Sequence, residues 1–134
     1  MNNILSKSPI TIAATDYEKL AELVEPTRVS MPELSNYLEQ ELDRAKIVSE
    51  ADPASVQMGS SVRFHDHGSG RMHEIRLVYP ADSSLAEGRL SVLTPVGSAL
   101  LGQQAGSTAP CRNATGRVRS LSVISVMPPD GAAP

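Results

Sequence analysis

Residues 61–79, SVRFHDHGSGRMHEIRLVY, alternate apolar and polar side chains on both sides of a glycine-rich turn at residues 68–70. The apolar positions of this alternation are Val62, Phe64, Ile75, Leu77 and Tyr79. A period of two residues is that of a β-strand, whose successive side chains point to opposite faces. Two such runs around a short glycine-containing turn predict a β-hairpin. This stretch therefore indicates that the second half of the chain is built on an antiparallel β-sheet.

One short helix interrupts the strands that follow. Residues 89–93 form a third expected strand, which ends at Thr94 and Pro95, a helix cap followed by a proline in the first helical position. The buried stripe of the helix is expected at Val96, Ala99 and Leu100. Gly102 is placed to end this helix, because glycine readily adopts the left-handed conformation found after helix ends.

The last quarter of the chain is less regular. In the weakly patterned region 103–115, Pro110 restricts any strand to the edge of a sheet, because proline cannot donate to a neighbouring strand. Residues 117–127 alternate again and predict the final strand. The apolar phase slips between Val123 and Ile124, which indicates a β-bulge at that point.

Before residue 50 the pattern has a helical period. A short β-branched segment, Ile10-Thr11-Ile12, predicts a first strand. Thr15 and Glu18 then form a capping box for an amphipathic helix over residues 16–25. Pro26 is expected to end this helix.

A second helix is predicted over residues 32–48. Ser30 and Glu33 repeat the capping-box pattern, and Pro32 lies in the first turn. The apolar face of this helix is Leu34, Leu38, Leu42 and Ala45. Two helices joined by a short connection pack as an antiparallel hairpin. The sequence thus predicts an α+β protein with a short N-terminal helical hairpin in front of an antiparallel sheet that carries one short helix.

A linker at residues 49–54 separates these two parts, which also differ in charge. Residues 1–53 carry 5 basic and 10 acidic side chains (−5), and residues 54–134 carry 7 basic and 5 acidic ones (+2). We therefore divide the chain into a helical unit, a sheet domain and a disordered tail. Their expected ranges are 1–50, 54–127 and 128–134.

Composition excludes several classes of function. The net charge of −3 argues against a general or sequence-specific nucleic-acid binder, which needs a cationic surface. With no Trp, one Phe and three Tyr, an aromatic-walled ligand pocket is not expected. Cys111 is the single cysteine, which excludes an intrachain disulfide and favours a reducing compartment. The N-terminus has no sustained apolar run, so we expect a cytoplasmic protein without a signal peptide or membrane span.

Three histidines and an aspartate within ten positions raise the question of a metal site. His65 has the solvent-facing parity of its strand and His67 shares that face, whereas Asp66 points away from both. His73 has the parity of the core side of the next strand. A zinc site needs three or four convergent ligands. We therefore expect a solvated turn with no metal and no cofactor, open only to adventitious nickel or zinc.

Several blocks of sequence resemble a known family. They are LDRAKIV (42–48), VQMGSSVRF (56–64), IRLVYPAD (75–82) and LSVLTPVGSALLG (90–102). In this order they are similar to the regulator of nucleoside diphosphate kinase (Rnk) family, which is related to the Gre transcript-cleavage factors. The resemblance covers about residues 10–108. It implies a helical hairpin followed by an FKBP-like domain with a strongly bent sheet.

The resemblance also implies a partner, bacterial RNA polymerase. Gre factors dock their C-terminal domain on the rim of the polymerase secondary channel and extend a coiled coil towards the active centre. Their docking surface has an acidic or polar residue and then Ser-Pro before the short helix, where this chain has Leu93-Thr94-Pro95. The partner-binding residues implied are Leu93, Thr94, Pro95, Val96, Gly97, Leu100 and Leu101.

Transcript cleavage itself is not expected. Gre factors carry two acids at the hairpin tip that help to hold a catalytic magnesium, and the tip here, VEPTRVSMPE, has no matching close acidic pair. Glu22 and Glu25 lie one helical turn apart but are typical of a solvated face. Helices of the expected lengths reach only roughly 15–25 Å at 1.5 Å per residue. The resemblance therefore implies a non-catalytic regulator that competes with Gre-type factors.

Two other functions fit the fold class less well. An FKBP-like binding module or peptidyl-prolyl isomerase uses a pocket lined with aromatic side chains, which Phe64 and three tyrosines cannot build. A metal-binding module is disfavoured by the strand parity of the histidines. The chain also departs from the family in its last quarter, where Gly106-Ser107 replaces Gly-Asp and PCRNATG replaces an aromatic strand. We therefore expect that the edge of the sheet differs from that of the family in this segment, or that this segment binds a different partner.

Overall fold

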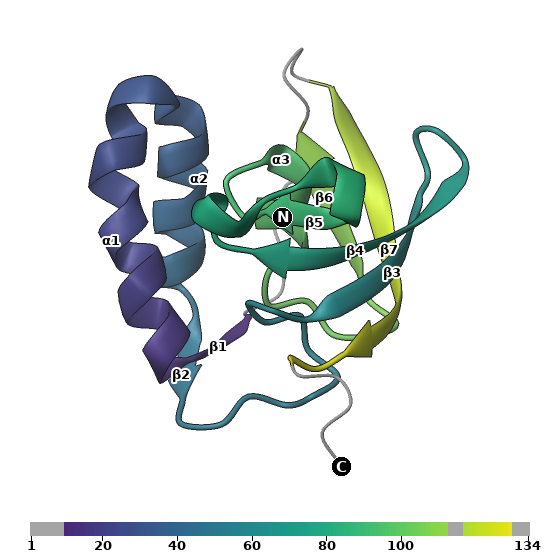
Figure 1. Cartoon of the computed structure of the whole chain (residues 1–134), viewed down its shortest axis with the longest axis horizontal. Coiled ribbons are helices and arrows are strands. Elements are labelled where there is room, and N and C mark those ends of the chain that lie inside the picture. The colour runs from purple at the N-terminus through teal and green to yellow at the C-terminus, as the bar shows by residue number, and fades with distance from the viewer. Residues whose placement is uncertain (1–9, 113–116, 130–134) are drawn as a thin grey trace, which may run out of the picture.

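A helical hairpin lies along one side of a curled sheet in the computed structural model, which describes residues 10–112 and 117–129 (Figure 1). The hairpin region comprises β1 (Thr11–Ala13), α1 (Ala14–Ser30), α2 (Pro32–Asp43) and β2 (Lys46–Val48). The sheet region comprises β3 (Ser61–Asp66), β4 (Arg71–Val78), η1 (Pro80–Asp82), η2 (Leu85–Glu87), β5 (Arg89–Ser91), α3 (Pro95–Leu100), β6 (Thr108–Arg112) and β7 (Val118–Met127). The predicted α+β class and the order of its parts are confirmed.

The first helix is longer than the sequence indicated, because Pro26 lies inside α1. Proline removes one helical hydrogen bond and crowds the preceding turn. Contacts between the helices on both sides of it hold the helical geometry. Thr27 is buried one residue after the proline, and the Ser35 hydroxyl on α2 donates to the Val24 carbonyl (2.6 Å). The expected end at residue 25 is therefore wrong, as is the Thr15 cap, since no side chain caps α1.

The second helix is shorter than expected, because residues 46–48 form β2 rather than its last turn. β2 pairs in parallel with β1, with Ile12 opposite Ile47, and this two-stranded sheet closes the base of the hairpin. Pairing with a strand more than thirty positions earlier outweighs the helical pattern. Pro32 begins α2 as predicted, but no side-chain cap is formed, so the expected Ser30 cap is wrong.

The five-stranded sheet has the order β5-β4-β3-β7-β6. The β3–β4 hairpin is confirmed, and its register places Phe64 opposite His73. Pro110 lies in β6, which is an edge strand as predicted. The register between β3 and β7 skips Ile124, which confirms the bulge. One pairing was not foreseen: β5 runs parallel to β4, because η1 and η2 form a crossover between them.

A single hydrophobic core joins the hairpin to the sheet. Its buried members from the hairpin region are Ile12, Leu20, Val24, Leu38 and Leu42, and those from the sheet region include Val62, Phe64, Leu77, Val92, Leu100, Leu101, Leu121 and Val123. Leu34 and Ala45, expected on the buried face of α2, are half-buried. Because the two parts share their buried surface, neither is complete without the other.

Gly102 lets the start of the described chain pack against the end of α3. Its φ is +79°, as expected of a residue that follows a helix end, and its amide donates to the Val56 carbonyl (2.7 Å). A Cβ atom at this position would lie 2.5 Å from Cβ of Ile10, which is itself buried. The glycine is therefore required both by its backbone conformation and by this close approach.

Replacing Gly102 by alanine should destabilise the protein more than the same change at Gly88. Gly88 has φ +74° but open space around it, so Gly88→Ala should cost about 1–2 kcal/mol of backbone strain. Gly102→Ala adds a steric overlap with Ile10, which we expect to lower the free energy of unfolding by a further ~1–3 kcal/mol. Urea unfolding of both variants measures the difference. Equal losses of stability would contradict the contact with Ile10.

The predicted disordered tail at 128–134 falls mostly outside the described residues. Pro129 is the last residue described, and it lies against Gly59. Residues 113–116, part of the divergent segment, also lie outside the described ranges. Within those ranges, no helix is long and apolar enough to cross a membrane.

Candidate functional site

The turn between β5 and α3 is built around the side chain of Thr94. Its hydroxyl accepts a hydrogen bond from the Gly97 amide (3.0 Å) and donates one to the Ser91 carbonyl (2.8 Å). The predicted helix cap is therefore confirmed. A side chain at Gly97 would overlap the Ser91 carbonyl oxygen, so the turn needs glycine there. We call residues 93–96 the docking turn.

All seven predicted partner-binding residues lie in this region, but they divide into two groups. In the docking turn, Pro95 is exposed while Leu93, Thr94 and Val96 are half-buried. The other three, Gly97, Leu100 and Leu101, are buried, and both leucines have 0% exposure. Of these seven residues, only those of the docking turn reach the surface. The buried group holds it in shape from below, and a polar change at Leu100 would disrupt the core.

The helical hairpin is fixed to the sheet domain by one buried amide. Gln57, 5% exposed, donates from Nε2 to the Thr11 carbonyl (2.8 Å) and to the Ser55 hydroxyl (3.0 Å). Its Oε1 accepts from the Ala13 amide (3.2 Å). On the edge of β1 that does not pair with β2, the Gln57 side chain therefore makes the hydrogen bonds that the backbone of a neighbouring strand would make. Sequence reasoning missed this residue.

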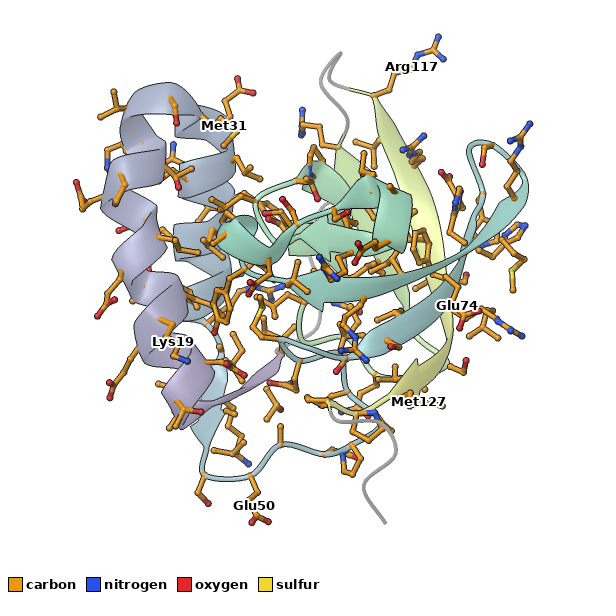
Figure 2. The ribbon with its side chains drawn as sticks, viewed as in Figure 1. Lys19, Met31, Glu50, Glu74, Arg117 and Met127 are labelled. Carbon is orange, nitrogen blue, oxygen red and sulfur yellow. The ribbon has the colours of Figure 1, made fainter. Side chains whose placement is uncertain are left out.

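A second polar contact lies where α1 meets the end of β4. The Tyr79 hydroxyl donates to Oδ1 of Asp16 (2.7 Å), and Nζ of Lys19 lies 5.7 Å from the centre of the Tyr79 ring. Burial raises the pKa of Tyr79, and the hydrogen bond to Asp16 raises it further. Figure 2 shows Lys19 on the lower part of α1, near the base of the hairpin.

The opposite helix of the hairpin makes its own polar contacts. Burial raises the pKa of Tyr37 on α2, and the nearby charge of Glu41 acts in the same direction. Glu41 is 4% exposed and pairs with Arg44 (3.2 Å), one turn later. α2 therefore carries a buried carboxylate that the sequence pattern did not reveal.

The tip of the hairpin is narrow and largely apolar. Met31 alone connects α1 to α2 and lies at the end of the hairpin (Figure 2). The side chain of Val29 is 89% exposed. Just below the tip, Arg28 binds Glu25 (3.0 Å) and Glu39 (3.4 Å). The hydrogen bond with Glu25 is the main cause of the raised pKa of Arg28. Glu25 is thus part of an ion pair with Arg28 and does not form a pair of free carboxylates with another acid.

The histidine-rich turn is shaped by its aspartate. Asp66 is buried, accepts from the Gly68 amide (2.8 Å) and pairs with Arg119 (3.4 Å). His73 stacks on Phe64 with ring centres 5.3 Å apart, although it stays exposed. In the part of the chain that the structure describes, no three side chains of the His, Cys, Asp and Glu types are grouped to hold a metal ion.

Comparisons with known proteins agree with this architecture. Residues 39–128 match the family described as "Transcription elongation factor, GreA/GreB, C-term", and residues 8–48 match the "Rnk N-terminus". A solved transcription elongation factor GreA/GreB from Nitrosomonas europaea superposes with a TM-score of 0.69 and 35% identity, covering 87% of this chain and 98% of that one.

Two curated relatives extend the comparison. The regulator of nucleoside diphosphate kinase of Escherichia coli K12 is 36% identical over 107 residues, which are 78% of each chain. The transcription inhibitor protein Gfh1 of Thermus aquaticus is 35% identical over 71 residues, which are 52% of this chain and 45% of Gfh1.

A helical hairpin docked on a GreA/GreB-type C-terminal domain defines the class of Gre-like transcription factors. Within that class, the chain belongs to the Rnk family. The resemblance found in the sequence is thereby confirmed.

Replacing Tyr79 by phenylalanine should make stability less sensitive to alkaline pH. In the unfolded chain tyrosine titrates near its ordinary pKa of 10.0, whereas folding raises the pKa of Tyr79. The unfolded state therefore loses its proton first, and the stabilisation, complete below pH 10, declines as the pH rises above it. Tyr79→Phe should flatten this decline in urea unfolding between about pH 9 and 11. Part of the decline should remain in this variant, because the pKa of Tyr37 is also raised on folding. A pH profile of stability identical to that of the parent would contradict the role of Tyr79.

Proposed function

We propose that this protein is a non-catalytic transcription regulator that binds bacterial RNA polymerase at the rim of the secondary channel. There it competes with Gre-type factors and lacks their transcript-cleavage activity. The observation that carries the proposal is the docking turn, an exposed Pro95 on a capped turn, in a domain of the GreA/GreB C-terminal family.

The docking turn is suited to binding because its backbone is already ordered. Thr94 and Gly97 fix its shape by hydrogen bonding, so little conformational entropy is lost when a partner binds. Leu93 and Val96 add apolar surface on either side of Pro95. A partner surface with a matching apolar patch would bury all three, in the position where the resemblance puts the polymerase rim.

The hairpin supports the same function and argues against cleavage. α1 has 17 residues and therefore spans only about 25 Å. Val29 and Met31 are exposed at its tip, and of the two acids in residues 24–33, Glu25 pairs with Arg28, so Glu33 has no second free carboxylate beside it in that segment with which to hold magnesium. The hairpin can thus occupy the mouth of the channel but brings no free pair of acids to the active centre.

An isomerase activity finds no support among the described residues. Phe64 is 4% exposed and is part of the core. Two of the tyrosines, Tyr17 and Tyr79, pack against the core where the hairpin meets the sheet domain, and burial of Tyr37 raises its pKa. The aromatic side chains are therefore not gathered around an open pocket.

Pro95→Glu should weaken binding to core RNA polymerase by at least about tenfold, which corresponds to about 1.4 kcal/mol. Glutamate is well tolerated in the first turn of a helix, so the fold should be kept while the exposed apolar surface gains a charge. Equilibrium binding of the labelled protein to purified core enzyme, with an unlabelled Gre factor as competitor, measures the effect. Ser120→Glu, at an exposed position of β7, is the control.

The parent and Ser120→Glu should bind saturably and be displaced by the Gre factor. Binding that the Gre factor does not displace would contradict the shared site. Absence of binding at concentrations on the order of tens of micromolar, a free energy weaker than about −6 kcal/mol, would mean that polymerase is not the partner.

Backtracked transcription complexes provide the test of catalysis. Added alone, the protein should leave the nascent RNA uncleaved, because its tip supplies no acidic pair. Added together with a Gre factor, it should slow cleavage in proportion to the occupancy measured by binding, and Pro95→Glu should slow it less. Cleavage stimulated by the protein alone would overturn the non-catalytic assignment.

A further inference from the structure

Two histidines that the proposed function does not use lie side by side on the open face of the sheet. His65 is in β3, and His67 follows two residues later with its amide bonded to the Ser120 carbonyl (2.9 Å). Their ring centres are 4.5 Å apart, with the rings at 75° to each other. Two imidazoles at this separation on one face can approach the same ion.

Met72 adds a third donor to this face. It is the register partner of His65 across the β3–β4 hairpin, so both side chains point to the same side of the sheet. Cβ atoms of such partners are about 4.5–5.5 Å apart, which is within the reach of a thioether. Met72 is 51% exposed, so packing in the core does not account for it. From the sequence, we considered only the three histidines and Asp66 as ligands and overlooked this residue.

The ring of His67 is held in place from behind. Its Nε2 lies 2.7 Å from the Ser122 hydroxyl, which in turn lies 3.1 Å from the Thr108 hydroxyl. A hydrogen bond on one ring nitrogen orients the imidazole and leaves the other nitrogen for a metal, as is usual for ligating histidines. Nδ1 of His67 is therefore the expected ligand atom.

The donor set selects the kind of metal. Asp66 is committed to the turn and to Arg119, and His73 stacks on Phe64 across the opposite face of the hairpin. Zinc normally takes three or four protein ligands from histidine, cysteine and carboxylates, and no such group exists among the described residues. Two imidazoles and a thioether instead suit Cu(I), a soft ion that accepts few ligands.

The charge around these residues does not add to the selection. Arg63 lies two residues before His65 but pairs with Glu74 (3.4 Å), and Arg71 is the register partner of Asp66, so it lies on the opposite face. The choice of ion therefore rests on the donor set. We propose that His65, His67 and Met72 form a binding site for a Cu(I) ion on the β3–β4 hairpin. This site is independent of the docking turn and of the proposed function.

The test is an anaerobic titration of the full-length protein with Cu(I) in the presence of a competing chelator, bicinchoninate. The parent should bind one Cu(I). His65→Gln and His67→Gln should each weaken binding by at least about 100-fold and Met72→Leu by about tenfold, since even outer partners of metal ligands change affinity by roughly 10–100-fold. His73→Gln, on the opposite face, and Met127→Leu, an exposed methionine elsewhere, should bind as the parent does.

Thermal unfolding separates a metal site from a mere effect on folding. Because the ligands come from both strands of the hairpin and from its turn, Cu(I) should raise the unfolding midpoint of the parent and of His73→Gln but not that of His67→Gln. Without metal, all these variants should unfold near the parent's midpoint. The proposal is overturned if Met72→Leu binds as tightly as the parent, if Zn(II) binds as tightly as Cu(I), or if binding needs millimolar metal, which would be adventitious.

Discussion

The side-chain amide of Gln57 connects the two halves of this molecule. β1 has β2 on one edge only, so the Thr11 carbonyl and Ala13 amide on its other edge would be left unpaired in a half-buried place. Unpaired polar groups that are buried cost about 1–3 kcal/mol each. Because α1 begins at the residue after β1, the amide that fixes β1 also fixes the direction of the hairpin. Tyr79 and Asp16 fix it a second time, in the first turn of α1.

These contacts fix the orientation of the hairpin relative to the sheet domain. The docking turn and the hairpin pack on one continuous core, so the direction of the hairpin is fixed relative to the turn. Figure 1 shows the hairpin lying along the sheet domain with its tip at the end remote from β1 and β2. A short hairpin held in this way can obstruct an opening near the docked domain without entering deeply.

Local chemistry explains which features were readable from the sequence. The Thr94 cap, the edge position of Pro110 and the bulge at Ile124 each depend on a few neighbouring residues. Features that depend on distant partners were missed. The helix continues through Pro26 because α2 packs against it, and residues 46–48 leave the helical pattern because they pair with β1. Gln57 gave no signal, since its hydrogen-bond partner Thr11 lies 46 positions earlier. For the predicted partner-binding residues, the sequence located the region but could not separate exposed Pro95 in the docking turn from buried Leu100 in α3.

Site-specific photocross-linking from the hairpin tip tests the central claim most directly. A benzophenone amino acid at position 29, where Val29 is 89% exposed, can be introduced without disturbing the core. In complex with core RNA polymerase, this account predicts adducts confined to the walls of the secondary channel near its opening, and their loss when excess Gre factor is added. Adducts at the catalytic centre would contradict the short, fixed hairpin, and adducts away from the channel would contradict the docking site.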